Sequence, residues 1–199
     1  MNIELFKTEK FSYVTLDEIY NEQELSYLWK EALFLCDENK LCPPEMSGSA
    51  FNDKGFIKNN LAVYISNDGV SNYSNLLSKP MKALLDNKQK LIEEDYTLNL
   101  YFSTNSISSL MSYYEDEHNY NSHYDCACYT YLFWLCKEPK QFIGGNFKFD
   151  DINEEIEFKN NFAILFPSWA KHSVEKVKFK GEKFQGLGRF CFSTFYNFK

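Results

Sequence analysis

The sequence predicts a mainly β fold preceded by α-helices, in the α+β class. Beyond about residue 95, short apolar runs alternate with polar turns, which is typical of a sandwich or jelly roll. Aromatic residues make up 18% of the chain and concentrate beyond residue 90, where they favour strands. Before residue 95, by contrast, apolar residues recur at helical spacing over residues 15–36 and 72–93.

The length of 199 residues is enough for one hydrophobic core, so we expect a single domain spanning 1–199. Within it, residues 1–94 are expected to form a helical support and lid region. Residues 95–199 are expected to form the jelly-roll core.

In the first half, residues 1–14 are expected to form a strand, and a helix is expected over 15–36. Thr15 and Glu18 have the spacing of a capping box at the start of that helix. Residues 37–60 contain helix breakers and are expected to form either a mobile surface connection or a functional lid.

A short strand is then expected over residues 61–65, followed by a helix over 72–93 that Pro80 would kink or divide. The later strands are expected over 96–102, 110–114, 127–136, 146–149, 156–158, 161–166, 172–177 and 189–196. The run 127–136 is almost wholly apolar, which predicts a strand buried on both faces.

Composition excludes some classes of protein. The net charge of −7 disfavours a nucleic-acid partner, because such binding depends on basic surface. No apolar run is long enough to span a membrane, and the N-terminus lacks a signal-peptide pattern, so a cytoplasmic protein is expected. Its cysteines should therefore be reduced, and those in apolar runs should be buried: Cys126, Cys128, Cys136 and Cys191.

The chain has three histidines, and two of them have the context of metal ligands. Residues i and i+2 of an extended segment point the same way, so His123 and Asp125 can direct an imidazole and a carboxylate at one point. A jelly roll brings early and late strands together, and His172 begins a late strand. Two histidines and one carboxylate are the ligands of non-haem Fe(II) oxygenases. Each residue alone has an ordinary structural interpretation, but the three together favour a metal site.

Arg189 opens the apolar run that ends the chain. A positive charge at the start of a core strand is costly unless it is paired. A bound organic acid would supply two parallel hydrogen bonds to its guanidinium. The alternative is a structural ion pair with one of the chain's acidic residues.

From about residue 110 to 196 the sequence resembles the Fe(II)/2-oxoglutarate-dependent dioxygenases, and in particular their prolyl 4-hydroxylase-like branch. Four features carry the resemblance: the His-x-Asp of residues 123–125, the Gly-Gly turn at 144–145, the distal histidine after the Phe-Pro-Ser of 166–168, and Gly-Arg-Phe at 188–190. One departure is an insert at residues 178–183, between His172 and Arg189.

The resemblance implies a double-stranded β-helix, the cupin-like form of the jelly roll. It implies that His123, Asp125 and His172 hold Fe(II) and that Arg189 pairs with the C5 carboxylate of 2-oxoglutarate. Three further residues are implied at the same co-substrate pocket: Tyr113, Tyr120 and Trp134, with Thr130 as a weaker candidate.

An enzyme of this class would use dioxygen and 2-oxoglutarate, with ascorbate as a candidate reductant, and release succinate. It would hydroxylate an unactivated C–H bond of a peptide, protein or small molecule, with a prolyl residue as one candidate. Two alternatives stay open: a catalytically silent jelly-roll binding protein, and a cupin-like metalloprotein that does not use 2-oxoglutarate. The second would not need a buried arginine at position 189.

Overall fold

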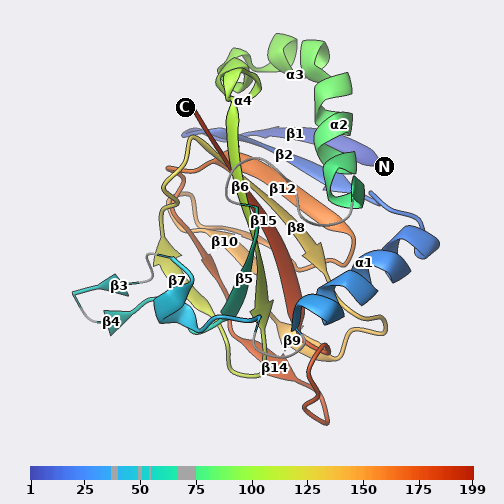
Figure 1. Cartoon of the computed structure of the whole chain (residues 1–199). Helices are drawn as coiled ribbons and strands as arrows, with labels where there is room; N and C mark the ends of the chain where they lie inside the picture. Colours follow the sequence, from blue (N-terminus) through green and yellow to red (C-terminus); the bar gives the residue numbers. More distant parts are fainter. Residues whose placement is uncertain (37–39, 49–50, 54, 67–74) are drawn as a thin grey trace.

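Two antiparallel β-sheets form the centre of the molecule in the computed structural model, which describes residues 1–36, 40–48, 51–53, 55–66 and 75–199 (Figure 1). The larger sheet contains, in spatial order, β1 (Asn2–Lys7), β2 (Ser12–Asp17), β12 (Phe162–Pro167), β8 (Tyr129–Leu135), β15 (Arg189–Asn197), β6 (Ser106–Tyr114) and β5 (Leu61–Ser66). The smaller sheet contains β11 (Glu154–Ile156), β10 (Phe147–Phe149), β13 (His172–Val174) and β7 (Tyr120–His123). Two further pairs join β9 (Phe142–Gly144) to β14 (Val177–Phe179), and β3 (Phe51–Asn52) to β4 (Gly55–Phe56).

The larger sheet is covered on both faces, which explains why its central strands are apolar throughout. In β8, Tyr131 and Phe133 pack into the core shared with the helices, whereas Leu132 and Trp134 pack into the core between the two sheets. Strand alternation therefore places neighbouring residues in different cores. The expected mainly β jelly roll with N-terminal helices is confirmed.

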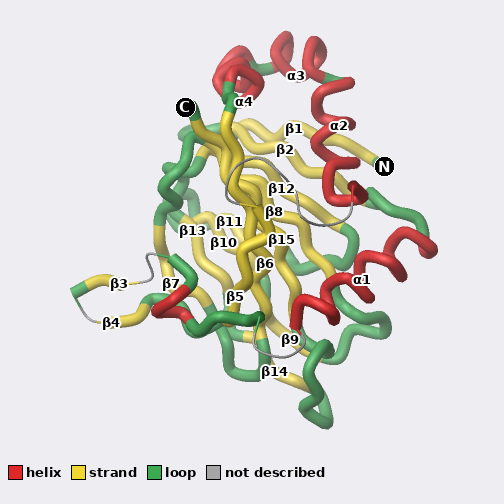
Figure 2. Tube along the Cα trace, in the orientation of Figure 1, coloured by secondary structure: helices red, strands yellow, loops and turns green. Residues whose placement is uncertain are grey.

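The helices lie on the side of the larger sheet away from the smaller one (Figures 1 and 2). They are α1 (Glu22–Cys36), α2 (Lys79–Asp86), α3 (Lys88–Glu94) and α4 (Asn99–Ser103), with 3-10 turns η1 (Pro44–Met46), η2 (Asn75–Ser78) and η3 (Tyr96–Leu98). Leu28, Ala32 and Leu35 of α1 are fully buried against the sheet. The N-terminal part also contributes β1, β2 and β5 to the larger sheet, so its contribution is not only helical.

The predicted start of the first helix is wrong by about six residues. Residues 1–14 form not one strand but most of a hairpin, in which β1 pairs with β2 and β2 continues through Thr15 to Asp17. The helix begins at Glu22, and its capping box is formed by Asn21 and Glu24, whose side chains each accept the other's backbone N–H. Thr15 is held in the sheet by pairing with Ile164. Long-range strand pairing therefore prevents the helix cap that the spacing of Thr15 and Glu18 predicted.

The helix expected over 72–93 is two helices, and residues 72–74 lie outside the described part of the chain. Pro80 lies in the first turn of α2, where its missing N–H costs nothing, and so does not kink the helix. The break falls instead at Asn87, whose side-chain amide donates to the carbonyl of Ala83. Asn87 thus ends α2 and precedes α3.

The strand predicted over 96–102 is wrong, because this segment forms η3 and α4. Asp95 accepts the backbone N–H of Thr97 at 2.9 Å, which starts a helical turn. Leu98 and Tyr101 are buried while Leu100 is exposed, which is a helical spacing and not the period of two that a strand requires.

The other predicted strands are present with small shifts, and the run 172–177 divides into β13 and β14. Strands β7 and β9 were not expected. All six cysteines are free, as predicted. Cys126 is exposed, contrary to expectation, because it lies in a loop that precedes β8.

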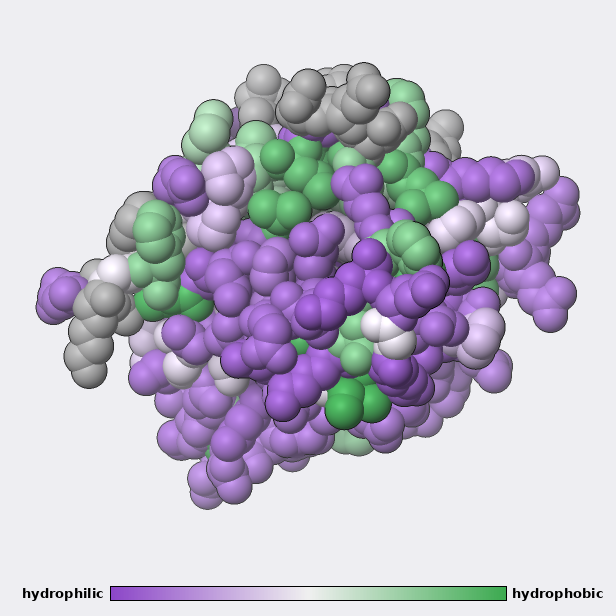
Figure 3. Space-filling model, turned by 90° about the horizontal axis from the view of Figure 1, so that it is seen from below, coloured by the Kyte–Doolittle hydropathy of each residue, from purple (hydrophilic) through white to green (hydrophobic). Residues whose placement is uncertain are grey.

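The part of the chain expected as a loop over 37–60 includes η1, β3 and β4; residues 37–39, 49–50 and 54 lie outside the described residues. The face in Figure 3 is mostly hydrophilic, with small separate apolar patches. Among the helices that the structure describes, none combines the length and the apolar character needed to cross a bilayer.

Candidate metal centre and its cavity

A cavity of about 270 Å³ opens beside the smaller sheet. Its walls include His123 from β7, His172 from β13 and Asp125 from the loop after β7. The segment that carries η1 and the residues before β5 supply Ser47 and Lys58 to the same cavity. Residues that are distant in sequence therefore line one cavity.

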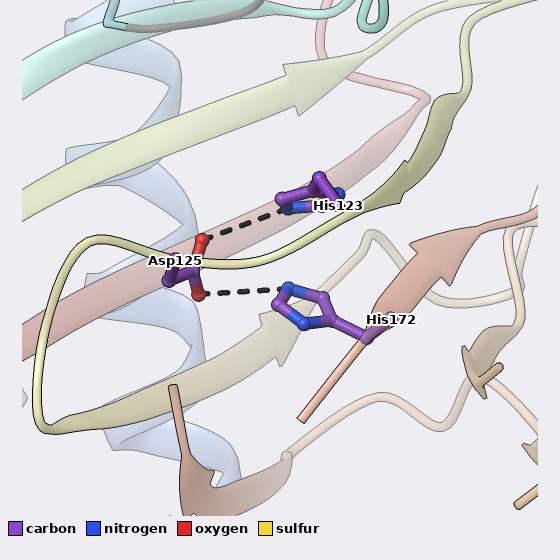
Figure 4. Close-up of side chains that lie close together, drawn as sticks. All are labelled: His123, Asp125 and His172. Carbon is purple, nitrogen blue, oxygen red and sulfur yellow. Dashed lines mark ion pairs between the residues drawn. The ribbon is translucent and has the colours of Figure 1, made fainter. Parts of the chain in front are cut away.

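His123, Asp125 and His172 converge in this cavity (Figure 4). The Nε2 atom of His123 lies 3.6 Å from Oδ1 of Asp125, and Nε2 of His172 lies 3.5 Å from Oδ2. One potential ligand atom from each residue lies within 4.8 Å of the other two. His123 and His172 are direct cross-strand partners, so the pairing of β7 with β13 fixes the position of both imidazoles.

Backbone carbonyls orient both imidazole rings. Nδ1 of His123 is 2.8 Å from the carbonyl oxygen of Asn121, and Nδ1 of His172 is 2.9 Å from that of Ala170. A carbonyl only accepts, so each Nδ1 carries a proton, and Nε2 is the atom of each ring that faces Asp125. Burial lowers the pKa of His123 to about 4; His172 acts in the same direction, and Asp125 opposes them. The neutral imidazole that binds a metal is thus the stable form near neutral pH.

Hydrogen bonds, and not the strand alternation expected from the sequence, position Asp125. It lies just after β7 and not within a strand, so strand alternation does not direct its carboxylate. Its backbone N–H donates to the carbonyl of Ser168, and its Oδ2 accepts from the hydroxyl of Thr130 at 2.7 Å. Thr130 is also 2.8 Å from the hydroxyl of Ser168, so a buried pair of hydroxyls holds the carboxylate. Thr130 therefore supports Asp125.

Arg189 is the only arginine of the chain and is fully buried. Its Nε donates to the carbonyl of Gly145 at 2.9 Å, but its two terminal nitrogens have no hydrogen-bond partner. None of the ion pairs between described residues includes it, which contradicts the structural ion pair considered from the sequence. Its guanidinium lies 5.0 to 5.3 Å from the ring centres of Tyr114, Trp134 and Phe158.

A buried guanidinium with two unsatisfied nitrogens is costly, and an anion that accepts both would remove that cost. The geometry of a planar carboxylate matches those two donors. Arg189 is therefore suited to hold an organic acid within the fold.

The Gly-Gly turn shapes the space for this arginine. Gly144 and Gly145 have φ of 70° and 75°, a region that favours glycine. A Cβ on Gly145 would lie 3.0 Å from Cδ of Arg189, and one on Gly144 would lie 2.2 Å from the carbonyl oxygen of Lys176. Both positions thus need glycine for conformation and for space.

Tyr113, predicted beside the co-substrate, does not line the cavity. It pairs with Phe190 in the core shared with the helices, and its hydroxyl accepts the backbone N–H of Gly186 at 2.7 Å and that of Gly188 at 3.3 Å. The next residue, Tyr114, pairs with Arg189 and lines the cavity. Because strand neighbours face opposite sides, Tyr114 and not Tyr113 faces the cavity.

The two other predicted residues have different placements. Tyr120 lines the cavity, and its ring stacks on His123 with centroids 3.5 Å apart. Trp134 does not line the cavity; it is fully buried beside Arg189, and its Nε1 has no hydrogen-bond partner. Trp134 therefore borders the arginine and not the metal ligands.

Lys58 is a cavity residue that sequence reasoning missed. It is 6% exposed, and its ammonium donates to the carbonyl of Ser47 at 2.6 Å. Burial lowers its pKa, and the charge of Asp125 opposes that effect. No sequence motif surrounds it, so only the tertiary structure could place it near the metal ligands.

These donors fit a metal ion. Two imidazoles and one carboxylate on one side leave other coordination positions open, which is the pattern of non-haem Fe(II) sites. The hydrogen bonds to both Nδ1 atoms and to Asp125 supply the outer support that metal ligands usually have.

Comparison with known proteins gives a family match. Residues 109–197, from β6 to β15, match the family model described as the 2OG-Fe(II) oxygenase superfamily. No curated protein matches the chain at a significant level.

Several solved structures share the fold at low sequence identity. A prolyl-4-hydroxylase from Pseudomonas putida has a TM-score of 0.65 at 13% identity, covering 96% of this chain and 94% of its own. The viral collagen prolyl hydroxylase of Paramecium Bursaria Chlorella virus-1 has a TM-score of 0.55 at 13% identity, with coverage of 93% and 96%. A prolyl hydroxylase from Trichoplax adhaerens, in complex with a hypoxia inducible factor peptide fragment, has a TM-score of 0.56 at 13% identity, with coverage of 93% and 83%. These likenesses show the fold.

Proposed function

Because residues 109–197 match the model of the 2OG-Fe(II) oxygenase superfamily, we propose that the protein is an Fe(II)- and 2-oxoglutarate-dependent dioxygenase that hydroxylates an unactivated C–H bond. The observation that carries this proposal is the placement of three candidate metal ligands, His123, Asp125 and His172, in one cavity. The buried and unpaired guanidinium of Arg189 supports the use of an organic acid. It also disfavours the cupin-like alternative that would use no 2-oxoglutarate.

In this proposal Nε2 of His123, Nε2 of His172 and the carboxylate of Asp125 hold the iron. When bound, Fe(II) supplies the activation of dioxygen that couples decarboxylation of 2-oxoglutarate to succinate with hydroxylation of a C–H bond. The carbonyls of Asn121 and Ala170 orient both imidazole rings so that Nε2 faces Asp125. Thr130 keeps the carboxylate turned toward the histidines.

The far carboxylate of 2-oxoglutarate would accept from both terminal nitrogens of Arg189. The carbonyl of Gly145 holds the guanidinium through Nε, and the surrounding rings exclude water that would otherwise solvate it. Ascorbate is the proposed reductant that keeps the iron in its ferrous state.

For the substrate we propose a class of molecule and not a single compound. A prolyl residue of a peptide or protein is the candidate that fits the prolyl hydroxylases among the fold neighbours. Their identity to this chain is low, so the fold likeness supports this candidate without assigning it.

The proposed activity predicts metal- and co-substrate-dependent turnover even without the prime substrate. With Fe(II), ascorbate, 2-oxoglutarate and dioxygen, the protein should form succinate, measured by mass spectrometry. A chelator, or Zn(II) in place of Fe(II), should reduce the rate to the level without enzyme, since Zn(II) has no redox chemistry. No succinate, together with no metal-dependent binding of 2-oxoglutarate, would favour a silent jelly-roll protein instead.

The different positions of Tyr113 and Tyr114 give a second prediction. Tyr113→Phe should leave the Kd for 2-oxoglutarate within twofold of the wild type, and it should lower the free energy of unfolding by about 1–2 kcal/mol, because the backbone N–H groups of Gly186 and Gly188 lose their acceptor. The matched variant is Tyr114→Phe, at the aromatic residue that lines the cavity, and it should weaken 2-oxoglutarate binding by up to about tenfold. Calorimetric titration and urea denaturation measure both effects. The reverse ranking of the two variants in Kd would restore Tyr113 to the site.

A further inference from the structure

Lys58 is a buried cation that the proposed chemistry does not use. Its side chain is 6% exposed, although lysine is among the residue types least often buried. It lines the same cavity as the three candidate metal ligands, and it comes from the segment just before β5. The proposed contacts to iron and 2-oxoglutarate leave this cation without an assigned role.

The position of its ammonium is fixed by neighbours. Nζ donates to the carbonyl of Ser47 at 2.6 Å and lies 5.8 Å from the ring centre of Tyr120. Tyr120 in turn stacks on His123, so the ring of Tyr120 lies near both the ammonium and a candidate iron ligand. The backbone of Lys58 forms a β-bridge with Tyr120, which ties the two residues together.

The ammonium keeps capacity for a further partner. It has three donors, and the Ser47 carbonyl accepts one of them. None of the ion pairs between described residues includes Lys58. Asp125 influences it only through its charge, and that carboxylate is directed at the histidines.

Lys58 and Arg189 serve different parts of the site. Arg189 lies between the sheets against Tyr114, at the inner side of the cavity lining, whereas Lys58 lines the cavity itself. The cavity lining also includes the exposed residues Tyr64 and Tyr124, so the cavity that Lys58 lines is open to solvent. A molecule that enters from solvent would therefore meet Lys58.

We infer that the prime substrate carries a carboxylate, which pairs with Lys58 while the C–H bond to be hydroxylated faces His123, Asp125 and His172. This inference rests on the proposed function and narrows its substrate class. The carboxylate is either the terminal carboxylate of a peptide or small acid, or that of an acidic side chain. Either kind of carboxylate would accept hydrogen bonds from Lys58 in the same way. A purely structural role, in which Lys58 only fixes the Ser47 turn, is the competing explanation.

The test uses the full chain loaded with Mn(II) and saturating 2-oxoglutarate, so that no turnover is needed. The probes are two pairs that differ only in charge: N-acetyl-L-proline against its methylamide, and N-acetyl-L-glutamate α-methylamide against the glutamine equivalent. Broadening of the probe's proton resonances by Mn(II) reports binding near the metal. In the wild type, at least one acid should bind at least tenfold more tightly than its neutral partner, and which pair does so identifies the source of the carboxylate.

Lys58→Met keeps the length of the side chain and removes its charge. It should abolish the preference for the acid, while the Kd for 2-oxoglutarate stays within twofold and the unfolding midpoint shows that the protein is folded. Lys58→Arg should restore part of the preference. The matched control is Lys148→Met, at a lysine of β10 whose strand neighbours Phe147 and Phe149 face the core, so that it points away from the cavity.

Three results would overturn the inference. They are equal binding or no binding of acid and neutral probes by the wild type, retention of the acid preference by Lys58→Met, and a tenfold loss of 2-oxoglutarate affinity in that variant, which would assign Lys58 to the co-substrate. Failure of the proposed function is distinguishable, because the wild type would then show no metal-dependent binding of 2-oxoglutarate at all.

Discussion

Replacing Arg189 with methionine should weaken 2-oxoglutarate binding at least 100-fold. The variant loses two charge-assisted hydrogen bonds to the C5 carboxylate, worth about 3 kcal/mol together, which corresponds to a factor of about 100 in affinity. Calorimetric titration of 2-oxoglutarate into Mn(II)-loaded protein measures the change.

The stability of the ligand-free protein separates this role from a structural one. The terminal nitrogens of Arg189 have no partner, so removing the guanidinium also removes the cost of a buried unsatisfied charge. That gain offsets the lost hydrogen bond to Gly145 and the lost ring contacts. The unfolding midpoint without 2-oxoglutarate should therefore change little, while the stabilisation by added 2-oxoglutarate should disappear.

Arg189→Lys is the matched variant, because it keeps the charge but loses the planar fork. It should bind 2-oxoglutarate with an affinity between those of the wild type and Arg189→Met. Wild-type affinity in Arg189→Met would show that the co-substrate carboxylate binds elsewhere.

Replacing His172 with alanine should reduce succinate formation at least 100-fold and weaken Fe(II) binding by a similar factor. Loss of residues that only support metal ligands already costs about 10- to 100-fold, so loss of a ligand should cost at least as much. Anaerobic titration of Fe(II), followed by the succinate assay at saturating Fe(II), measures binding and turnover separately.

The third histidine, His118, supplies a control for the effect of replacing any histidine with alanine. His118 lies outside the metal centre, and its Nδ1 accepts the backbone N–H of Glu115. His118→Ala should keep succinate formation within about threefold of the wild type.

His172 also packs against Phe147 and Phe166, so its removal could disturb the core. Asp125→Asn avoids that problem, because asparagine has the same size and can still accept from Thr130. It should lose Fe(II) affinity while keeping the wild-type unfolding midpoint to within a few degrees. Wild-type Fe(II) affinity in both variants would contradict the metal centre.

The sequence alone determined the fold class and the three candidate metal ligands. Short apolar or alternating runs over most of the last 100 positions predict strands, and the wholly apolar run over 127–136 predicts a strand buried on both faces. The helical spacing within residues 15–36 predicts a packed helix. The three metal ligands were identifiable because histidine is rare in this chain and because a jelly roll brings early and late strands together. Arg189 was identifiable because a charge at the start of a core strand needs a partner.

Local signals failed where two conformations were both possible. Residues 96–102 alternate well enough for a strand, but the cap from Asp95 and the burial of Leu98 and Tyr101 favour helical turns. Thr15 and Glu18 have capping spacing, but pairing of β2 with β12 holds Thr15 in the sheet.

Only the tertiary structure decided which side chains share a site. Tyr113 and Tyr114 are identical in type and adjacent, so sequence cannot say which one faces Arg189; the register of β6 with β15 gives that place to Tyr114. Lys58 enters the cavity through contacts with Ser47 and Tyr120, distant segments that no local pattern connects to it. The physical reason is that composition and periodicity fix which residues must be buried, whereas strand register and long-range pairing fix which of them meet.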